Sequence, residues 1–145
     1  MRNYLLLGVF AVLVTSCTPG RNANNTPPPA SAARKVLSSA ISVQVTDANY
    51  EDFVRSHKVV LLFFWAEWSA LDRAMMPTID HIATEYLGRV TIGKVNVDDN
   101  AELAQKFGIK GIPTLVVLKD GSEQDRVVGL APKKQITELL HKQLN

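Results

Sequence analysis

Residues 59–65 place the strongest constraint on the fold, because all seven are apolar and no polar side chain interrupts them. A strand has this composition when helices cover both faces of its sheet, as at the centre of an α/β domain. The stretch that follows, about residues 69–86, has apolar residues at intervals of three and four: Met75, Ile79, Ile82 and Tyr86. This spacing predicts an amphipathic helix, in which Pro77 should introduce a kink.

Shorter patterns on either side complete the order of elements. We expect strands at residues 41–45, 90–97, 114–118 and 125–128, and helices from Thr46, Asp47 or Asn49 to about Arg55, at 101–107, and from Pro132 onwards. Gly93 is expected to make the third strand locally irregular, and the turn at residues 120–122 joins the last two strands as a hairpin. Parallel crossovers followed by a hairpin predict a mixed β-sheet with helices on both faces.

The first 16 residues have the pattern of a secretion signal. Arg2 precedes an apolar run at residues 5–14, which is too short to span a bilayer, since a spanning helix needs about 20 apolar residues. The run ends in Val14-Thr-Ser-Cys17, which resembles the bacterial lipobox. This resemblance implies cleavage before Cys17 and acylation of its thiol and amine, which would anchor the protein to a membrane. The alternative is an ordinary secretion signal with a chance cysteine.

Residues 17–41 are rich in Pro, Asn, Ala and Ser and have no apolar periodicity. This composition predicts a disordered tether. The predicted division is therefore a signal peptide at 1–16, a lipidated cysteine and tether at 17–41, and one folded domain at 42–145. We expect a lipid-anchored protein of the bacterial cell envelope that faces the periplasm. Thr18, where inner-membrane lipoproteins carry Asp, favours the outer membrane.

The single cysteine, Cys17, excludes an internal disulfide, a cysteine-based zinc cluster and a two-thiol redox cycle within the chain. The net charge is only +2 and no basic run exceeds two residues, so we expect no nucleic-acid partner. The three histidines, His57, His81 and His141, are scattered without the spacing of metal ligands. We expect each of them to be a solvated surface residue, and we expect neither a metal nor a cofactor.

Four motifs in one order and spacing resemble the thioredoxin family. They are Phe64-Trp-Ala-Glu-Trp68 followed by Pro77, then Lys94-Val-Asn-Val-Asp98, Gly108-Ile-Lys-Gly-Ile-Pro-Thr114 and Val128-Gly129. The resemblance extends over about residues 43–145. It implies a thioredoxin-like α/β fold, with a mixed β-sheet flanked by helices on both faces.

The resemblance also exposes what this chain lacks. The family carries Trp-Cys-Gly-Pro-Cys where this chain has Trp68-Ser-Ala-Leu-Asp72. In the family, the first cysteine attacks as a thiolate and the second releases the reduced substrate. Ser69 is a much poorer nucleophile at neutral pH, and Asp72 cannot resolve a mixed disulfide. The buried carboxylate of the family falls at Phe63, which has no proton to transfer. We therefore predict no catalytic residues and a redox-inactive domain.

Ser69 and Asp72 instead have the spacing of a helix cap. Ser-x-x-Asp resembles the capping box, in which the Ser69 hydroxyl would accept a hydrogen bond from the Asp72 amide. The Asp72 carboxylate would also be stabilised by the positive end of the helix dipole. A hydrolytic or metal site that uses Ser69 or Asp72 is the alternative.

The peptide-binding groove of the family is retained. The resemblance assigns it to Trp68, Ile112, Pro113, Val128 and Gly129, with a cis peptide bond between Ile112 and Pro113. Leu71 and Leu130 would enlarge its apolar surface. The alternative is that Trp68 and Pro113 persist only for packing. The amine of Lys94, which would neighbour the missing carboxylate, is expected to reach solvent or to pair with Asp98 or Glu67.

Three functions remain open at this point. The leading hypothesis is a membrane-tethered, redox-inactive thioredoxin-like protein that binds an extended peptide or partner protein in the cell envelope, with main-chain pairing along the Ile112–Pro113 loop. The second is a thiol–disulfide oxidoreductase or its accessory, with sulfur supplied by Cys17 or by a partner. The third is a structural spacer or assembly subunit.

Overall fold

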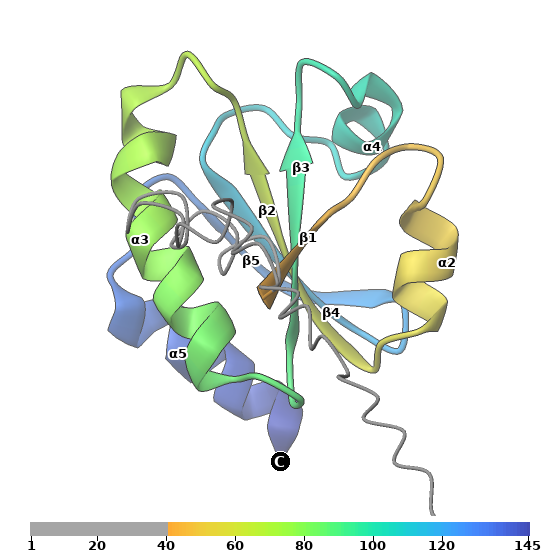
Figure 1. Ribbon diagram of the computed structural model, residues 1–145, viewed down its shortest axis with the longest axis vertical. Coiled ribbons are helices and arrows are strands. Elements are labelled where there is room, and N and C mark those ends of the chain that lie inside the picture. The colour runs from red at the N-terminus through yellow and green to blue at the C-terminus, as the bar shows by residue number, and fades with distance from the viewer. Residues whose placement is uncertain (1–40) are drawn as a thin grey trace, which may run out of the picture.

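The structure is a computed structural model and describes residues 41–145. The predicted signal peptide, Cys17 and all but the last residue of the predicted tether lie outside the described residues. The described part of the chain forms a sheet with two helices on each face (Figure 1). Within it, no helix has both the length and the apolar composition needed to cross a bilayer.

The sheet has five strands in the order β1-β3-β2-β4-β5. Three strands, β1 (Ser42–Gln44), β3 (Thr91–Asn96) and β2 (Val59–Trp65), run parallel. The other two, β4 (Thr114–Lys119) and β5 (Ser122–Val128), are antiparallel to their neighbours. The helices are α2 (Tyr50–Arg55), α3 (Ala70–Glu85), α4 (Ala101–Lys106) and α5 (Lys133–Leu144). The predicted mixed sheet with flanking helices is confirmed.

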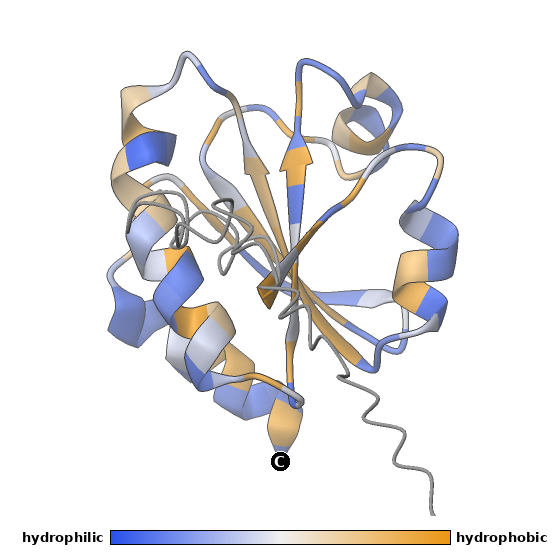
Figure 2. Cartoon of the chain, viewed as in Figure 1, coloured by the Kyte–Doolittle hydropathy of each residue, from blue (hydrophilic) through white to orange (hydrophobic). Residues whose placement is uncertain are grey.

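Strand β2 is central and separates two apolar cores. Leu61 and Phe63 point into the core beneath α3 and α5, whereas Leu62 and Phe64 point into the core beneath α2 and α4. All four side chains have 0% exposure. This double burial is the reason for the uninterrupted apolar run in the sequence, because both faces of β2 are covered. Apolar residues accordingly follow the central strands in Figure 2.

The hairpin between β4 and β5 forms as predicted, but β5 begins three residues earlier than the sequence pattern indicates. Lys119 pairs with Ser122, so Asp120 and Gly121 are the only loop residues, and both have positive φ angles of 50° and 78°. Such a two-residue turn continues the ladder directly into β5. The first residues of β5 are exposed and polar, because this strand lies at the edge of the sheet.

The expectation of an irregular strand at Gly93 is wrong. Gly93 lies in regular register with both Val43 and Leu62. A Cβ atom at this position would lie 2.8 Å from the side chains of Leu62 and Val45. The glycine is therefore required for close packing beneath α2, not for an unusual backbone conformation. Helix α3 continues through Pro77 as a single helix of 16 residues.

Candidate functional site

The loop between β2 and α3 occupies the position of the family's reactive cysteines. Ser69 is the N-cap of α3, with an extended backbone, and its Oγ accepts a hydrogen bond from the Asp72 amide at 3.3 Å. The predicted cap is therefore present. It satisfies one of the free amides at the start of the helix, which is the ordinary role of a serine there.

Asp72 does more than the capping pattern predicts. Its side chain is completely buried, and Oδ2 accepts a hydrogen bond from the amide of Ala66 at 2.8 Å. The Ser69 amide, which a reciprocal capping box would direct to Asp72, donates instead to the Ala66 carbonyl. The carboxylate therefore connects the first turn of α3 to the end of β2.

The burial of Asp72 was missed, although the sequence contained a signal for it. Asp72 lies three residues before Met75 and so extends the buried stripe of α3 by one step, with Ile79 the next member. A residue on this stripe faces the sheet. A carboxylate in such a position needs donors from the neighbouring backbone, and the amide of Ala66 supplies one.

A second hydrogen bond fixes the outer part of the same loop. The Arg73 guanidinium donates from Nη1 to the carbonyl of Glu67 at 2.7 Å. Asp72 and Arg73 thus hold the two residues that precede Trp68. Where the family places two thiols, this chain has a hydrogen-bonded turn that presents an indole.

Trp68 is 68% exposed, and its ring is held in one orientation. The indole Nε1 donates to Oδ2 of Asp98 at 2.9 Å, in the loop after β3. An exposed tryptophan fixed in this way offers a flat apolar surface whose polar edge is already satisfied.

The other predicted groove residues meet at the same end of the sheet. The Ile112–Pro113 peptide bond is cis, and the Pro113 carbonyl accepts a hydrogen bond from the Gly129 amide at 2.7 Å. Thr114 pairs with both Phe64 and Val128, so the end of β5 is level with the end of β2. The structure therefore brings the loop before β4 and the loop after β5 together beside the end of β2.

Most of the exposed large apolar side chains gather at this end. Among residues 41–145 there are six, and four lie where β2 and β5 end: Trp68, Leu71, Val128 and Leu130, with exposures of 68%, 48%, 63% and 57%. We call these four residues the apolar rim. Of the other predicted groove residues, Pro113 is buried and Ile112 is half-buried.

The expected partners of Lys94 are wrong. Its Nζ forms an ion pair with Oδ1 of Asp80 at 2.7 Å, and the side chain is almost fully buried. Lys94 is the register partner of Phe63 in the neighbouring parallel strand, so both side chains point towards α3, which carries Asp80. Asp98 and Glu67 follow the ends of their strands and lie beyond this register. Asp80 thus supplies the counter-charge where the family's buried carboxylate is replaced by a phenyl ring.

Two of the three histidines, His81 and His141, are exposed as predicted, whereas His57 is half-buried. His57 Nδ1 lies 2.7 Å from the Phe53 carbonyl oxygen. The exposed His141 has its Nε2 2.8 Å from the Tyr86 hydroxyl. Among residues 41–145, no group of three or more His, Cys, Asp or Glu side chains has an arrangement that could hold a metal.

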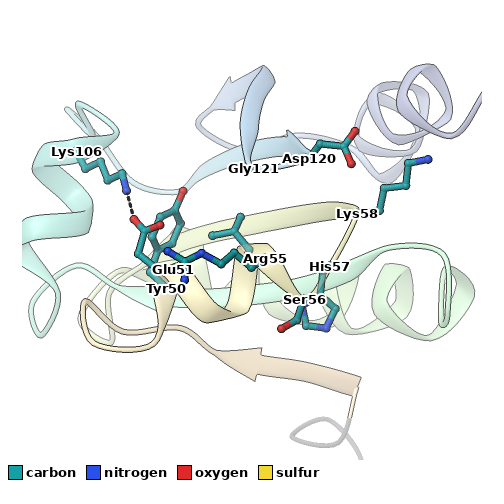
Figure 3. A pocket seen from close by; sticks show the side chains of 10 residues that line it. Tyr50, Glu51, Arg55, Ser56, His57, Lys58, Lys106, Asp120 and Gly121 are labelled. Carbon is teal, nitrogen blue, oxygen red and sulfur yellow. Dashed lines mark hydrogen bonds and ion pairs between the residues drawn. The ribbon is translucent and has the colours of Figure 1, made fainter.

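A hollow of about 630 Å³ lies between α2 and the β4–β5 turn, away from the apolar rim (Figure 3). Lys106 pairs with Glu51 at 2.7 Å and lies over the ring of Tyr50. Arg55 and Lys58 add two further positive charges to the lining, and Asp120 adds one negative charge. Charges of both signs line this hollow, so it is not built for a ligand of one strong charge. Ser56 and His57 also line it, but the Ser56 hydroxyl donates to the Asp52 carbonyl and His57 Nδ1 lies 2.7 Å from the Phe53 carbonyl.

Comparisons with known proteins agree with this geometry. The family model named Thioredoxin matches residues 41–142. Thioredoxin 1 of Nostoc sp. (strain PCC 7120 / SAG 25.82 / UTEX 2576) is 40% identical over 104 residues, which are 71% of this chain and 97% of that protein. Thioredoxin of Staphylococcus aureus is 41% identical over 102 residues, which are 70% of this chain and 97% of the relative.

A solved structure shows the same architecture. A mutant thioredoxin from Halobacterium salinarum NRC-1 aligns with a TM-score of 0.67 and 28% identity, covering 72% of this chain and 91% of that one. The fold and the site thus define a thioredoxin-like domain. The chain belongs to the thioredoxin family.

Proposed function

We propose that this chain is a redox-inactive member of the thioredoxin family that binds an extended peptide or a segment of a partner protein. The binding residues are Trp68, Leu71, Ile112, Pro113, Val128 and Gly129. The observation that carries the proposal is the contrast around the start of α3. In the first turn of α3 the buried Asp72 carboxylate replaces a thiol, while in the loop before it the Trp68 indole is exposed and fixed.

The argument against thiol exchange rests on the replaced side chains. The Ser69 hydroxyl accepts a hydrogen bond from the Asp72 amide, and the Asp72 carboxylate accepts one from the Ala66 amide. Both side chains are therefore hydrogen-bonded to the backbone. An alcohol cannot form a stable mixed disulfide, and a carboxylate cannot resolve one. Phe63 is fully buried in the core, where the family places its carboxylate.

The argument for binding rests on the loops opposite Trp68. Within residues 41–145, neither the amide nor the carbonyl of Ile112 takes part in a backbone hydrogen bond. An extended peptide can therefore pair with this residue as an added strand, while its side chains contact the apolar rim. Main-chain pairing supplies affinity, and the apolar contacts supply selectivity.

The location of the domain is a further part of the proposal. Cleavage before Cys17 and acylation of that residue would attach the domain to the bacterial envelope through residues 18–40, facing the periplasm, with Thr18 favouring the outer membrane. The lipobox pattern at residues 14–17 supports this. Metabolic labelling with an alkyne fatty acid should mark the wild-type protein and not a Cys17→Ala variant. Equal labelling of both would remove the anchor from the proposal.

A second candidate is a thiol–disulfide oxidoreductase or an accessory to one. The names of the relatives favour it, since they are thioredoxins about 40% identical to this chain. The sulfur would have to come from Cys17 or from a partner's cysteines. This candidate requires catalysed disulfide reduction that depends on Cys17 or on a second protein.

Photo-crosslinking in intact envelopes tests the binding proposal. Wild type should crosslink to a partner species that Trp68→Ala loses, because truncation removes the exposed indole. Leu87→Ala is the matched control, since Leu87 is 69% exposed but follows α3 at its far end. Equal crosslinking of all three proteins would contradict peptide binding at this groove and would favour a structural spacer.

A further inference from the structure

We infer that the first ligand of this groove is the chain's own proline-rich segment, residues 21–35, bound in cis over the apolar rim. The inference rests on the proposed function, because it assigns an occupant to the same groove. It makes the segment a competitor that an external peptide must displace.

The surface and the segment match in chemistry. Residues 27–29 are three consecutive prolines. Prolines favour the extended polyproline II conformation and lose little entropy on binding, and such segments dock on grooves lined by aromatic side chains. Trp68 offers its face for this contact because its Nε1 is already bonded to Asp98.

The charges are also complementary. All 14 acidic residues of the chain lie within residues 41–145, whereas residues 1–40 contain only basic charged residues. Three of those basic residues flank the prolines: Arg21, Arg34 and Lys35. On the domain, three exposed carboxylates lie beside or near Trp68, at Glu67, Asp98 and Asp99. These carboxylates all lie on the Trp68 side, whereas the exposed Lys110 lies in the loop before Ile112. The carboxylates would therefore attract the basic residues at one end of the segment and set its direction over the rim.

The length of chain before the domain is sufficient. In the sheet register, Ser42 pairs with Ile92, and Ile92 pairs with Leu61. Strand β1 therefore begins beside Leu61, four residues before β2 ends at Trp65. Four residues along the strand and two strand spacings across it amount to roughly 16 Å. The eleven residues 30–40 reach roughly 34 Å in a polyproline II conformation. The prolines can therefore reach the groove from the start of β1.

A segment held in cis has a large advantage over a free peptide. Short flexible connections give effective concentrations on the order of 1 mM. If the free segment binds with a dissociation constant on the order of 0.1 mM, the cis copy weakens an external ligand by about tenfold. With that dissociation constant, the segment would occupy most of the groove until a tighter ligand displaced it.

The test uses the full chain in detergent and a synthetic peptide of residues 21–35 as the probe, titrated by calorimetry. A chain with Pro27, Pro28 and Pro29 all changed to Ser should bind the probe about tenfold more tightly than wild type, because its own segment no longer competes. These substitutions lie outside the folded domain, so they leave it intact. Adding Trp68→Ala should abolish binding, whereas adding Leu87→Ala should not, with unfolding midpoints measured for both.

The other outcomes each overturn the inference. Equal affinity of wild type and the proline variant would show that the segment does not occupy the groove. Binding that survives Trp68→Ala would place the segment elsewhere, and absence of binding to every chain would show that it is not a ligand. None of these outcomes changes the result expected from crosslinking in envelopes. A failure of this inference can therefore be distinguished from a failure of the proposed function.

Discussion

The two sides of the proposed groove differ in what they retain of the family pattern. On one side, the start of α3 has lost both thiols and has gained the Ser69 cap and the buried Asp72 carboxylate. On the other side, two loops meet through the Pro113–Gly129 hydrogen bond, and the Ile112–Pro113 peptide bond is cis. Under the proposed function, electron transfer and recognition belong to separate segments of this fold, so one can be replaced while the other is kept.

Restoring the two thiols should have the largest effect, because it should return disulfide-reducing activity to the start of α3. A Ser69→Cys, Asp72→Cys double variant in a Cys17→Ser background should acquire insulin-reducing activity where the parent has none, because the helix start lowers the pKa of a cysteine placed there. Turbidity of precipitating insulin measures the rate. The Ser69→Cys single variant is the control, since it has no resolving thiol. An inactive but folded double variant would mean that restoring the thiols is not enough, because Phe63 still replaces the buried carboxylate or because the opposite loops do not support exchange.

The next largest effect concerns the buried ion pair behind Phe63. Asp80→Ala should lower the free energy of unfolding by about 2–3 kcal/mol, because the almost fully buried Lys94 amine loses its counter-charge. Lys94→Met should be milder, since the Asp80 side chain is 34% exposed and is readily hydrated. Urea denaturation measures both. The reverse ranking would show that the lysine is not desolvated.

The next prediction concerns the contribution of the buried Asp72 carboxylate to stability. Asp72→Ala should lower the free energy of unfolding by about 1–3 kcal/mol, because the Ala66 amide loses its acceptor. Asp72→Asn retains an acceptor oxygen and should lose less. Glu67→Ala, an exposed neighbour whose backbone carbonyl alone accepts from Arg73, serves as the control. If Asp72→Ala is as stable as wild type, the carboxylate does not hold this loop.

The smallest effect lies away from the groove, between α3 and α5. The hydrogen bond from Lys133 holds the pKa of Glu85 below its usual value of 4.5. A carboxyl whose pKa is lowered by folding stabilises the fold above its unfolded pKa, and this contribution disappears as the pH falls through the folded value. As the pH falls below about 4.5, the Glu85→Gln variant should therefore lose slightly less stability than the wild type does. Its peptide binding should be unchanged. Thermal unfolding midpoints from pH 7 to pH 3 measure this.

Much of the fold was predictable because local patterns and tertiary structure agree. The burial of β2 follows from its uninterrupted apolar run, and the buried face of α3 follows from the spacing of its apolar residues. The start of β5 was missed because Ser122, Glu123 and Gln124 are polar residues on an edge strand, whose membership depends on pairing with β4. No alternation marks such a strand.

The site was predictable in its backbone and less so in its side chains. The Ser69 cap follows from local spacing and was confirmed. The partner of Lys94 depends on cross-strand register with Phe63, which places the amine against Asp80, and sequence separation carries no information about that register. The burial of Asp72 was encoded in the spacing of the α3 stripe, but the capping pattern gave a simpler explanation for the same residue.

The most direct test of the central claim is insulin reduction by the full chain and by its Cys17→Ser variant, with dithiothreitol as the reductant. Both should match the rate without protein, because neither Ser69 nor Asp72 can exchange a disulfide. Catalysed reduction that persists in the Cys17→Ser variant would contradict the account.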